Sequence, residues 1–169
     1  GYGTEVTIPG TLPYNGADVA VTQIERAFDG AEITSVVLPT TLTHIGNYAF
    51  AHSNLTTINI SASVTTIGEY AFQNCDNLQS IDLSATKVKE IKSNAFYSCD
   101  NLNTIVFPAT LETIGDDVFS GCRKIKSIDL SNTKLTTIGG RAFMYCNELK
   151  PLSLPATLRT FCALCPQLL

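Results

Sequence analysis

Two short hydrophobic patterns alternate along this chain. The first is a phrase of the form I-G-x-x-A-F, and it ends on phenylalanines that lie 22, 22, 24, 23 and 24 residues apart. These residues are Phe28, Phe50, Phe72, Phe96, Phe119 and Phe143. The second is L-x-x-I-x-L, whose alternation of apolar and polar residues predicts a short strand with one buried face. One such strand in each period of 22 to 24 residues is typical of a leucine-rich-repeat solenoid.

The period also predicts how the coils pack. We expect the L-x-x-I-x-L strands to form a parallel β-sheet on one face of a right-handed superhelix, with short helical turns on the other face. The phenylalanines should stack as a continuous spine, because adjacent strands of a sheet lie about 4.8 Å apart. The glycines of the first pattern suit a tight turn into the helical turn, with a positive φ as one option. They are Gly46, Gly68, Gly115 and Gly139.

The complete repeat reads T-x-I-G-x-x-A-F-x-x-C-x-x-L-x-x-I-x-L-P, and this phrase resembles the BspA-like class of bacterial leucine-rich repeats. The resemblance covers residues 24 to about 168. Proteins of this class occur on bacterial surfaces and are linked to adhesion, host-matrix binding and co-aggregation. The resemblance therefore implies a non-enzymatic module of a bacterial cell-surface or secreted protein that binds a protein or glycan of a host or neighbouring cell. The alternative is a structural spacer or scaffold domain without a specific ligand.

The chain has three predicted parts. Residues 1–23 form an N-terminal β-hairpin cap over the first coil, since Asn15-Gly16 is a strong hairpin-turn signal. Residues 24–156 form the array of 22–24-residue coils, and residues 157–169 form a contracted C-terminal coil or cap. This last coil is apolar at Phe161, Leu164 and Leu168. We therefore expect it to be buried by its own tail or by end-on self-association with a second chain.

Composition and charge restrict the classes of partner. The chain has 169 residues and a formal net charge of −4, which disfavours nucleic acid as the main partner. No run approaches 18 apolar residues, so no membrane span is expected. Residues 1–75 hold one basic and six acidic side chains, so the N-terminal half should be negative. The chain begins at Gly1 without a signal sequence, so either a leader was removed or the chain is cut from a longer one. The resemblance implies a protein of the cell surface or exterior, with its leader absent from this chain.

The outward positions of the predicted strands are the candidate ligand-binding residues. They are Ser35, Val37, Thr57, Asn59, Ser80, Asp82, Thr104, Val106, Ser127, Asp129 and Ser153. This set is small, polar and mildly acidic, and it contains no Trp, Tyr or Arg, the residues that dominate binding hot spots. Weak or multivalent contact is therefore expected. Tyr48 and Tyr70, beside the Ala-Phe turns, form a second candidate patch, and covering the spine is the alternative role for them.

Cysteines share one slot of the repeat, three residues after the phenylalanine. In the full coils the slot is held by Cys75, Cys99, Cys122 and Cys146. We expect a ladder of reduced, buried thiols, because Cys packs as a small hydrophobe. Disulfides between adjacent coils and a metal site are the alternatives, and in-register side chains make the disulfide dihedral awkward. The pair Cys162-x-x-Cys165 stands alone, so the sequence leaves its redox state open.

No motif in the sequence predicts catalysis or a cofactor. His44 and His52 lie in variable slots of the repeat, outside any nucleophile or metalloprotease motif. Asp76 and Asp100 share a slot in adjacent coils. A calcium ion is one interpretation of these two carboxylates, and an Asp-Asn turn into the next strand is the other. We expect no enzymatic activity, no cofactor and no resident metal.

Overall fold

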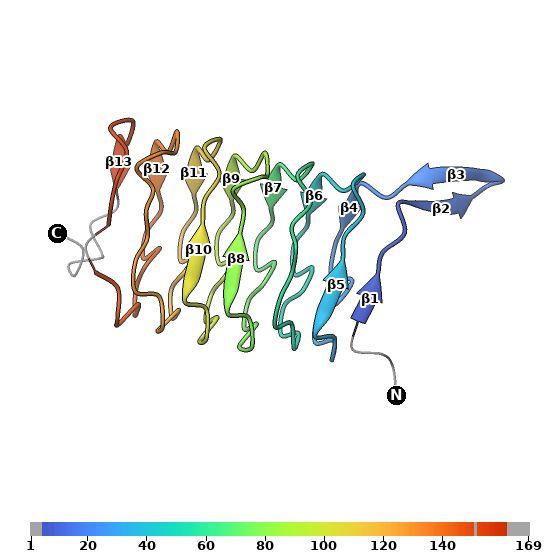
Figure 1. Cartoon of the computed structure of the whole chain (residues 1–169), viewed down its shortest axis with the longest axis horizontal. Coiled ribbons are helices and arrows are strands. Elements are labelled where there is room, and N and C mark those ends of the chain that lie inside the picture. Colours follow the sequence, from blue (N-terminus) through green and yellow to red (C-terminus); the bar gives the residue numbers. More distant parts are fainter. Residues whose placement is uncertain (1–4, 151, 162–169) are drawn as a thin grey trace.

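The protein is described by a computed structural model over residues 5–150 and 152–161. Successive coils stack along one axis, and each coil lies against its sequence neighbours (Figure 1). Strands recur at two places in the coil, so two rows of strands run along the array. The strand pairs that join one coil to the next are parallel, as the repeat predicts.

One row is a continuous seven-stranded sheet that follows the chain in order. Each strand has two residues, and the strands are β4 (Gln23–Ile24), β6 (His44–Ile45), β7 (Thr66–Ile67), β9 (Glu90–Ile91), β11 (Thr113–Ile114), β12 (Thr137–Ile138) and β13 (Thr160–Phe161). The first residue of each strand is polar, and the second is a buried isoleucine in every strand except β13. This sheet coincides with the T-x-I part of the repeat, where no strand was expected.

The second row corresponds to the L-x-x-I-x-L pattern, and here the prediction of one continuous sheet is wrong. β5 (Ser35–Val37) pairs with β1 (Glu5–Thr7), and β8 (Ser80–Asp82) pairs with β10 (Thr104–Val106). Two further junctions in this row are single bridges, from Val37 to Asn59 and from Asp129 to Ser153. A proline or an Asp-Ser turn follows the strand segment, which limits the number of ladder hydrogen bonds it can form. The inward and outward positions of the pattern are as predicted, because the middle Ile or Val is buried.

The predicted helical turns do not form in residues 5–150 or 152–161. The segment around each phenylalanine is instead a series of turns whose amides bond alternately within the coil and to the next coil. The Phe50 amide donates to the Ala71 carbonyl at 2.8 Å, whereas the Ala49 amide donates back to Gly46 at 3.4 Å. An α-helix directs its amides four residues back, so it cannot share them with a neighbouring coil. Over the same ranges, no helix is long and apolar enough to cross a membrane.

Two residues of each such turn have a left-handed backbone. They lie two residues before and two residues after the phenylalanine, and around Phe50 they are Tyr48 and His52, with φ values of 53° and 57°. The same two positions are left-handed around all six phenylalanines, up to Arg141 and Tyr145. A residue other than glycine in this conformation costs about 1–3 kcal/mol and persists only where its surroundings hold it. Here the hydrogen bonds to the neighbouring coil hold it.

The glycines of the I-G pattern have a different role from the one predicted. Gly46, Gly68, Gly115 and Gly139 do not have a positive φ. A Cβ added to Gly68 would lie 2.6 Å from the carbonyl carbon of Gly46 and 2.8 Å from the nitrogen of Asn47. Close approach of two backbones therefore requires glycine here.

The phenylalanine spine forms as predicted. Adjacent rings from Phe28 to Phe143 stack with centroids 5.1–5.7 Å apart and planes within 16° of parallel. This spacing is typical of offset aromatic stacking. From Phe28 to Phe119, the amide of each phenylalanine also donates to the carbonyl of the residue that precedes the next phenylalanine, so the stacked rings come from hydrogen-bonded coils. Fully buried rings are those of Phe50, Phe72, Phe96 and Phe119.

The N-terminal segment contains the predicted hairpin, but the hairpin does not cover the first coil. β2 (Thr11–Tyr14) and β3 (Ala17–Ala20) pair antiparallel around Asn15-Gly16, whose φ values are 50° and 80°. All residues of both strands are exposed, and the hairpin projects away from the array (Figure 1). The residues that pack against the core flank the hairpin; they are Val6, Ile8 and Val21. The flanking segments therefore cover the first coil in place of the hairpin.

The contracted C-terminal coil is described only at its start. β13 pairs with β12 and ends at the half-buried Phe161. Cys162, Leu164, Cys165 and Leu168, and with them the predicted end-on contact, lie outside the described residues.

Replacing Phe96 with Ala should lower the free energy of unfolding by about 3–5 kcal/mol, because a buried ring in the middle of the spine leaves a cavity. Tyr48→Ala is the comparison, since Tyr48 is half-buried and its ring stacks on Tyr70 at the surface. Its loss should be much smaller in urea unfolding at one pH. Equal losses for the two variants would contradict the assignment of the spine as the core.

Candidate functional site

The candidate residues from the sequence share one face of the array, which we call the strand face. All of them except the half-buried Ser35 are exposed. Val37 lies opposite Asn59 in the next coil, and Asp82 lies opposite Val106. The predicted columns are therefore in register where the strands or bridges pair, and their side chains form ordered rows along the face.

The strand face is hollowed across three successive coils. The hollow has a volume of about 520 Å³. Its lining residues are Asn103, Thr104, Lys124, Lys126, Ser127 and Glu148. Lys124 Nζ donates to Asn101 Oδ1 at 2.5 Å, and Lys126 Nζ lies 3.8 Å from Glu148 Oε2. Thr104 and Ser127 belong to the predicted set. Lys124 and Lys126 were not predicted, because they precede the strand segment that begins at Ser127 and only outward positions within such segments were considered.

Two carboxylates of the strand face are held by the turn that follows them. Asp82 accepts a hydrogen bond from the Ser84 amide at 2.9 Å. Asp129 accepts from both the Ser131 amide, at 3.0 Å, and the Ser131 hydroxyl, at 2.6 Å. Hydrogen bonds from Ser84 and Ser131 lower the pKa of Asp82 and of Asp129 respectively. Both side chains are therefore negative at neutral pH and contribute fixed charge to this face.

The two histidines are exposed and have ordinary polar neighbours. His44 Nδ1 lies 2.8 Å from the Thr43 hydroxyl. His52 Nδ1 lies 3.1 Å from Asp29 Oδ1 in the preceding coil. The Thr43 hydroxyl also donates to the Thr22 carbonyl at 3.1 Å, and the contact of His52 with Asp29 lies at the exposed surface.

Asp76 and Asp100 lie close enough to interact, as their shared slot predicts. Partial burial, and then the nearby charge of Asp100, raise the pKa of Asp76. Asp100 also lies 3.7 Å from Arg123 Nε, and Asn101 Nδ2 donates to the Asp76 carbonyl at 2.6 Å. A calcium ion takes six to eight oxygen ligands. In the described part of the chain, no group of three or more His, Cys, Asp or Glu side chains is placed to hold a metal ion.

The cysteine ladder forms as predicted, with free and buried thiols. They are Cys75, Cys99, Cys122 and Cys146. Each thiol donates to the carbonyl of the phenylalanine in the preceding coil, for example Cys75 Sγ to Phe50 O at 3.0 Å. Burial raises the pKa of Cys75 to about 11 and raises that of Cys99 well above its ordinary value. The ladder therefore joins coils through neutral thiols and is poorly suited to nucleophilic chemistry.

A second candidate surface lies over the left-handed turns, and we call it the turn face. It comprises the residues from two before to two after each phenylalanine. Tyr48 and Tyr70 stack here with ring centroids 4.8 Å apart, and the Arg26 guanidinium lies 4.3 Å from the Tyr48 ring centre. The aromatic pair expected from the sequence is thus confirmed.

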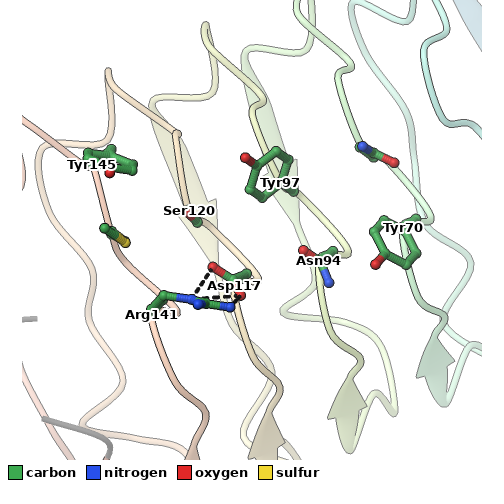
Figure 2. Close-up of a pocket in the computed structure, with 9 residues that line it drawn as sticks. Tyr70, Asn94, Tyr97, Asp117, Ser120, Arg141 and Tyr145 are labelled. Atoms are coloured by element: carbon green, nitrogen blue, oxygen red, sulfur yellow. Dashed lines mark hydrogen bonds and ion pairs between the residues drawn. The ribbon is translucent and has the colours of Figure 1, made fainter. Parts of the chain in front are cut away.

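A groove of about 480 Å³ continues along the turn face beyond this pair. Its lining residues are Tyr70, Gln73, Asn94, Tyr97, Asp117, Ser120, Arg141, Met144 and Tyr145. Figure 2 shows Tyr97 and Tyr145 on either side of Ser120, with the ion pair of Asp117 and Arg141 at one end. Apart from Tyr70, these residues escaped the sequence analysis, because the groove depends on side-chain sizes in neighbouring coils.

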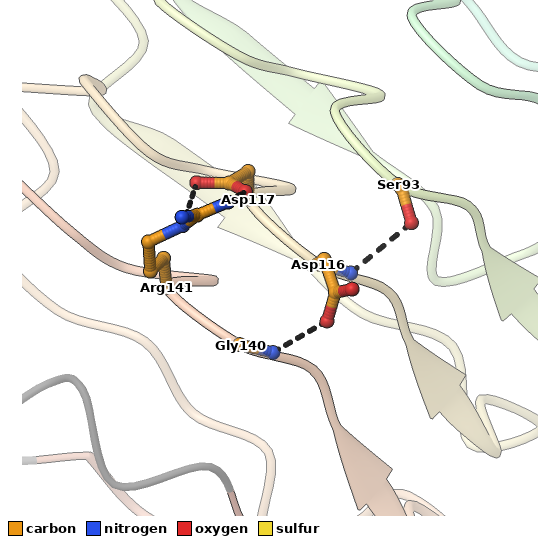
Figure 3. A network of polar contacts seen from close by, with 5 residues as sticks. All are labelled: Ser93, Asp116, Asp117, Gly140 and Arg141. Carbon is orange, nitrogen blue, oxygen red and sulfur yellow. Dashed lines mark hydrogen bonds and ion pairs between the residues drawn. The ribbon is translucent and has the colours of Figure 1, made fainter.

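The ion pair in the groove is held by three hydrogen bonds and by the backbone of the neighbouring residues. Arg141 Nε donates to both carboxylate oxygens of Asp117 at 3.1 Å, and Nη2 donates to Oδ2 at 2.7 Å. Asp116 and Gly140, which precede the two charged residues, also join neighbouring coils through hydrogen bonds (Figure 3). Asp116 Oδ1 accepts from the Gly140 amide at 2.6 Å, and Ser93 Oγ accepts from the Asp116 amide at 3.2 Å. The charged pair is therefore held in one geometry.

Parallel coils of 22–24 residues, one phenylalanine spine and one cysteine ladder define a bacterial type of leucine-rich-repeat solenoid. The family model described as BspA type Leucine rich repeat region matches residues 81–165, with 6 copies. This chain belongs to the BspA type leucine-rich repeat family. No curated protein sequence matches it.

Solved bacterial structures share the fold. A leucine-rich repeat protein of T. pallidum (TpLRR) is 34% identical over 72% of this chain and 59% of its own, with a TM-score of 0.65. One from Bacteroides ovatus is 30% identical over 94% of this chain and 50% of its own, with a TM-score of 0.58. The pneumococcal vaccine antigen PcpA, at 20% identity over 90% and 40% of the two chains, has a TM-score of 0.75 and supports the fold alone. This chain thus spans 40–59% of the length of these three proteins.

The cysteine ladder predicts a specific labelling result. At neutral pH, a thiol reagent should label the native protein slowly at Cys75, Cys99, Cys122 and Cys146, because these thiols are buried. Denaturation without reductant should make all four react at once, as read by mass spectrometry of the labelled peptides. If these peptides gain no label in the denatured, unreduced protein, the cysteines form disulfides, and the assignment of a ladder of free thiols is wrong.

Proposed function

We propose that this array is a non-enzymatic binding module of a bacterial cell-surface or secreted protein, and that its strand face contacts a protein or glycan of a host or neighbouring cell. The observation that carries the proposal is the hollow at Thr104 and Ser127, where the ordered columns of the strand face meet two lysines. Binding sites of repeat proteins commonly use such extended surfaces, since successive coils present side chains in rows.

Charge indicates which part of a ligand enters the hollow. Lys124 and Lys126 line the hollow, and the exposed Glu148 carboxylate lies 3.8 Å from Lys126 Nζ. Exposed ion pairs of this kind contribute little and exchange readily with an incoming anion. We expect the ligand to present an acidic side chain or an acidic sugar at this place, while the columns around Asp82 disfavour a uniformly acidic ligand.

The proposed location and the absence of catalysis rest on separate observations. PcpA, a vaccine antigen, and a leucine rich cell surface protein of Faecalibacterium prausnitzii share this fold at 20% and 24% identity, which supports a surface location. The exposed histidines contact Thr43 and Asp29, and the sequence contains no nucleotide-binding or nucleophile motif. These features support a binding role over an enzymatic one.

A rigid spacer without a ligand is the alternative function. The specific observation in its favour is the absence of Trp, Tyr and Arg from the strand-face set, since these residues supply most binding energy at interfaces.

The test is binding of the purified protein to immobilised fibronectin, laminin and collagen and to a glycan array. The double variant Lys124→Glu, Lys126→Glu should weaken binding about tenfold or more, because it replaces two attractive charges at the hollow with repulsive ones. Raising the salt concentration should weaken wild-type binding in the same direction.

The matched control is Lys87→Glu, Lys134→Glu, which makes the same change of net charge at exposed lysines outside the hollow. It should retain wild-type binding. Equal losses in both double variants would indicate a non-specific charge effect and contradict the assignment of the strand face. No binding to any surface would favour the spacer.

A further inference from the structure

The groove on the turn face arises from the order of side-chain sizes in three adjacent coils. Ser120 and Gly121 belong to the middle coil, Tyr97 to the preceding coil and Tyr145 to the following coil. Ser120 is 2% exposed and forms part of the floor. Small residues between two large ones leave the tyrosines as the walls of an open groove (Figure 2).

We propose that this groove binds a neutral saccharide, with one pyranose ring between Tyr97 and Tyr145 and its hydroxyl groups toward Asp117 and Arg141. This groove lies on a different face from the strand-face hollow, so sugar binding here can be tested independently of the function proposed above.

The spacing of the walls fits a single sugar ring. Stacked rings of adjacent coils lie 5.4 and 5.7 Å apart at Phe96, Phe119 and Phe143. Tyr97 follows Phe96 by one residue and Tyr145 follows Phe143 by two, so the two tyrosines are separated by about two coil spacings along the array, at neighbouring positions of the turn. An aromatic ring contacts a flat partner with centres about 4.5–7 Å apart, so one ring can lie between the walls. The C–H face of a pyranose is apolar and packs on such rings, and Tyr145 is 59% exposed.

The polar end of the groove suits hydroxyl groups. Asp117 and Arg141 form a bidentate pair whose side chains are 13% and 54% exposed. A carboxylate oxygen has two lone pairs and a guanidinium has five N–H donors, so the pair presents an acceptor and donors side by side. Two neighbouring hydroxyl groups of a sugar can use both, since one can donate to the carboxylate while the other accepts from the guanidinium. The two charges balance each other, which favours an uncharged ligand over an anion or a cation.

Backbone chemistry in the groove disfavours an extended peptide. A peptide strand adds to a protein through unpaired main-chain amides and carbonyls at an edge. Here the amides of Asn94, Asp117 and Gly121 donate to the next coil, and those of Tyr97 and Ser120 donate within their own turns. Recognition must therefore use side chains, and the side chains present are aromatic rings, amides and one ion pair.

The experiment is a titration of the whole chain, labelled with ¹⁵N, with the methyl glycosides of glucose, galactose and N-acetylglucosamine. At least one of these sugars should shift the amide signals of Tyr97, Ser120 and Tyr145 in a saturable manner. The variant Tyr145→Asn should weaken binding about tenfold, since it removes a wall and keeps a residue that tolerates the left-handed backbone, as Asn74 does. Tyr97→Gln should act likewise, whereas Tyr97→Phe should bind within about twofold of wild type because the ring is kept.

Tyr14→Ala is the control, because Tyr14 is also an exposed tyrosine and lies on the projecting hairpin. It should not alter sugar binding, and neither should Lys124→Glu, Lys126→Glu on the strand face. Absence of sugar-induced shifts, shifts located elsewhere, or shifts that survive both wall variants would overturn the proposal. A leucine- or tyrosine-rich peptide that shifts the groove amides when no sugar does would also overturn it, by assigning the groove to a protein ligand.

Discussion

Each coil of this protein bonds to the next through the backbone amide of its buried phenylalanine, and this contact sets the distance at which everything else repeats. The Phe72 amide lies 2.7 Å from the Ala95 carbonyl, and the rings of Phe72 and Phe96 stack 5.1 Å apart. At this distance a Cβ on Gly68 would clash with the backbone of Gly46. The same distance lets the Cys99 thiol donate to the carbonyl of Phe72, the phenylalanine of the preceding coil. The small Ala or Val before each phenylalanine follows from the same distance.

The inter-coil bonds also explain why the turn face is strained and yet ordered. Tyr48 and Arg141 are left-handed although neither residue type favours that conformation. The Tyr48 amide donates to the Glu69 carbonyl of the next coil, and the Gly140 amide beside Arg141 donates to the Asp116 carboxylate of the preceding coil, so an alternative φ would disturb a bond between coils. The side chains of these residues are therefore presented outward at fixed intervals, and a surface of this kind loses little conformational freedom when it binds a ligand.

Residues that recur at the same place in every period could be assigned from the sequence. Surfaces that depend on which side chains lie together in neighbouring coils could not. Phe96 and Cys99 recur at a constant place in each period, so their stacking and burial could be inferred directly. The two-residue strands were missed, because two positions cannot show a period. Helical turns were wrongly expected after the glycines of the I-G pattern, because these glycines also suit a tight turn into a helix, whereas here they allow two backbones to approach. Asn94 and Asp117, which tolerate a left-handed backbone, were the available signal at those positions. The groove at Ser120 requires a comparison of side-chain sizes across three coils.

Amide hydrogen exchange tests the central role of the inter-coil bonds most directly. If these bonds hold the array together, the amides of Phe50, Phe72, Phe96 and Phe119 should exchange only with unfolding of the array, more slowly than the amides of the exposed hairpin strands β2 and β3 by several orders of magnitude. Protection should be greatest for Phe72 and Phe96, since a linear array unfolds more readily from its ends. Phenylalanine amides that exchange as fast as those of the hairpin would contradict the account.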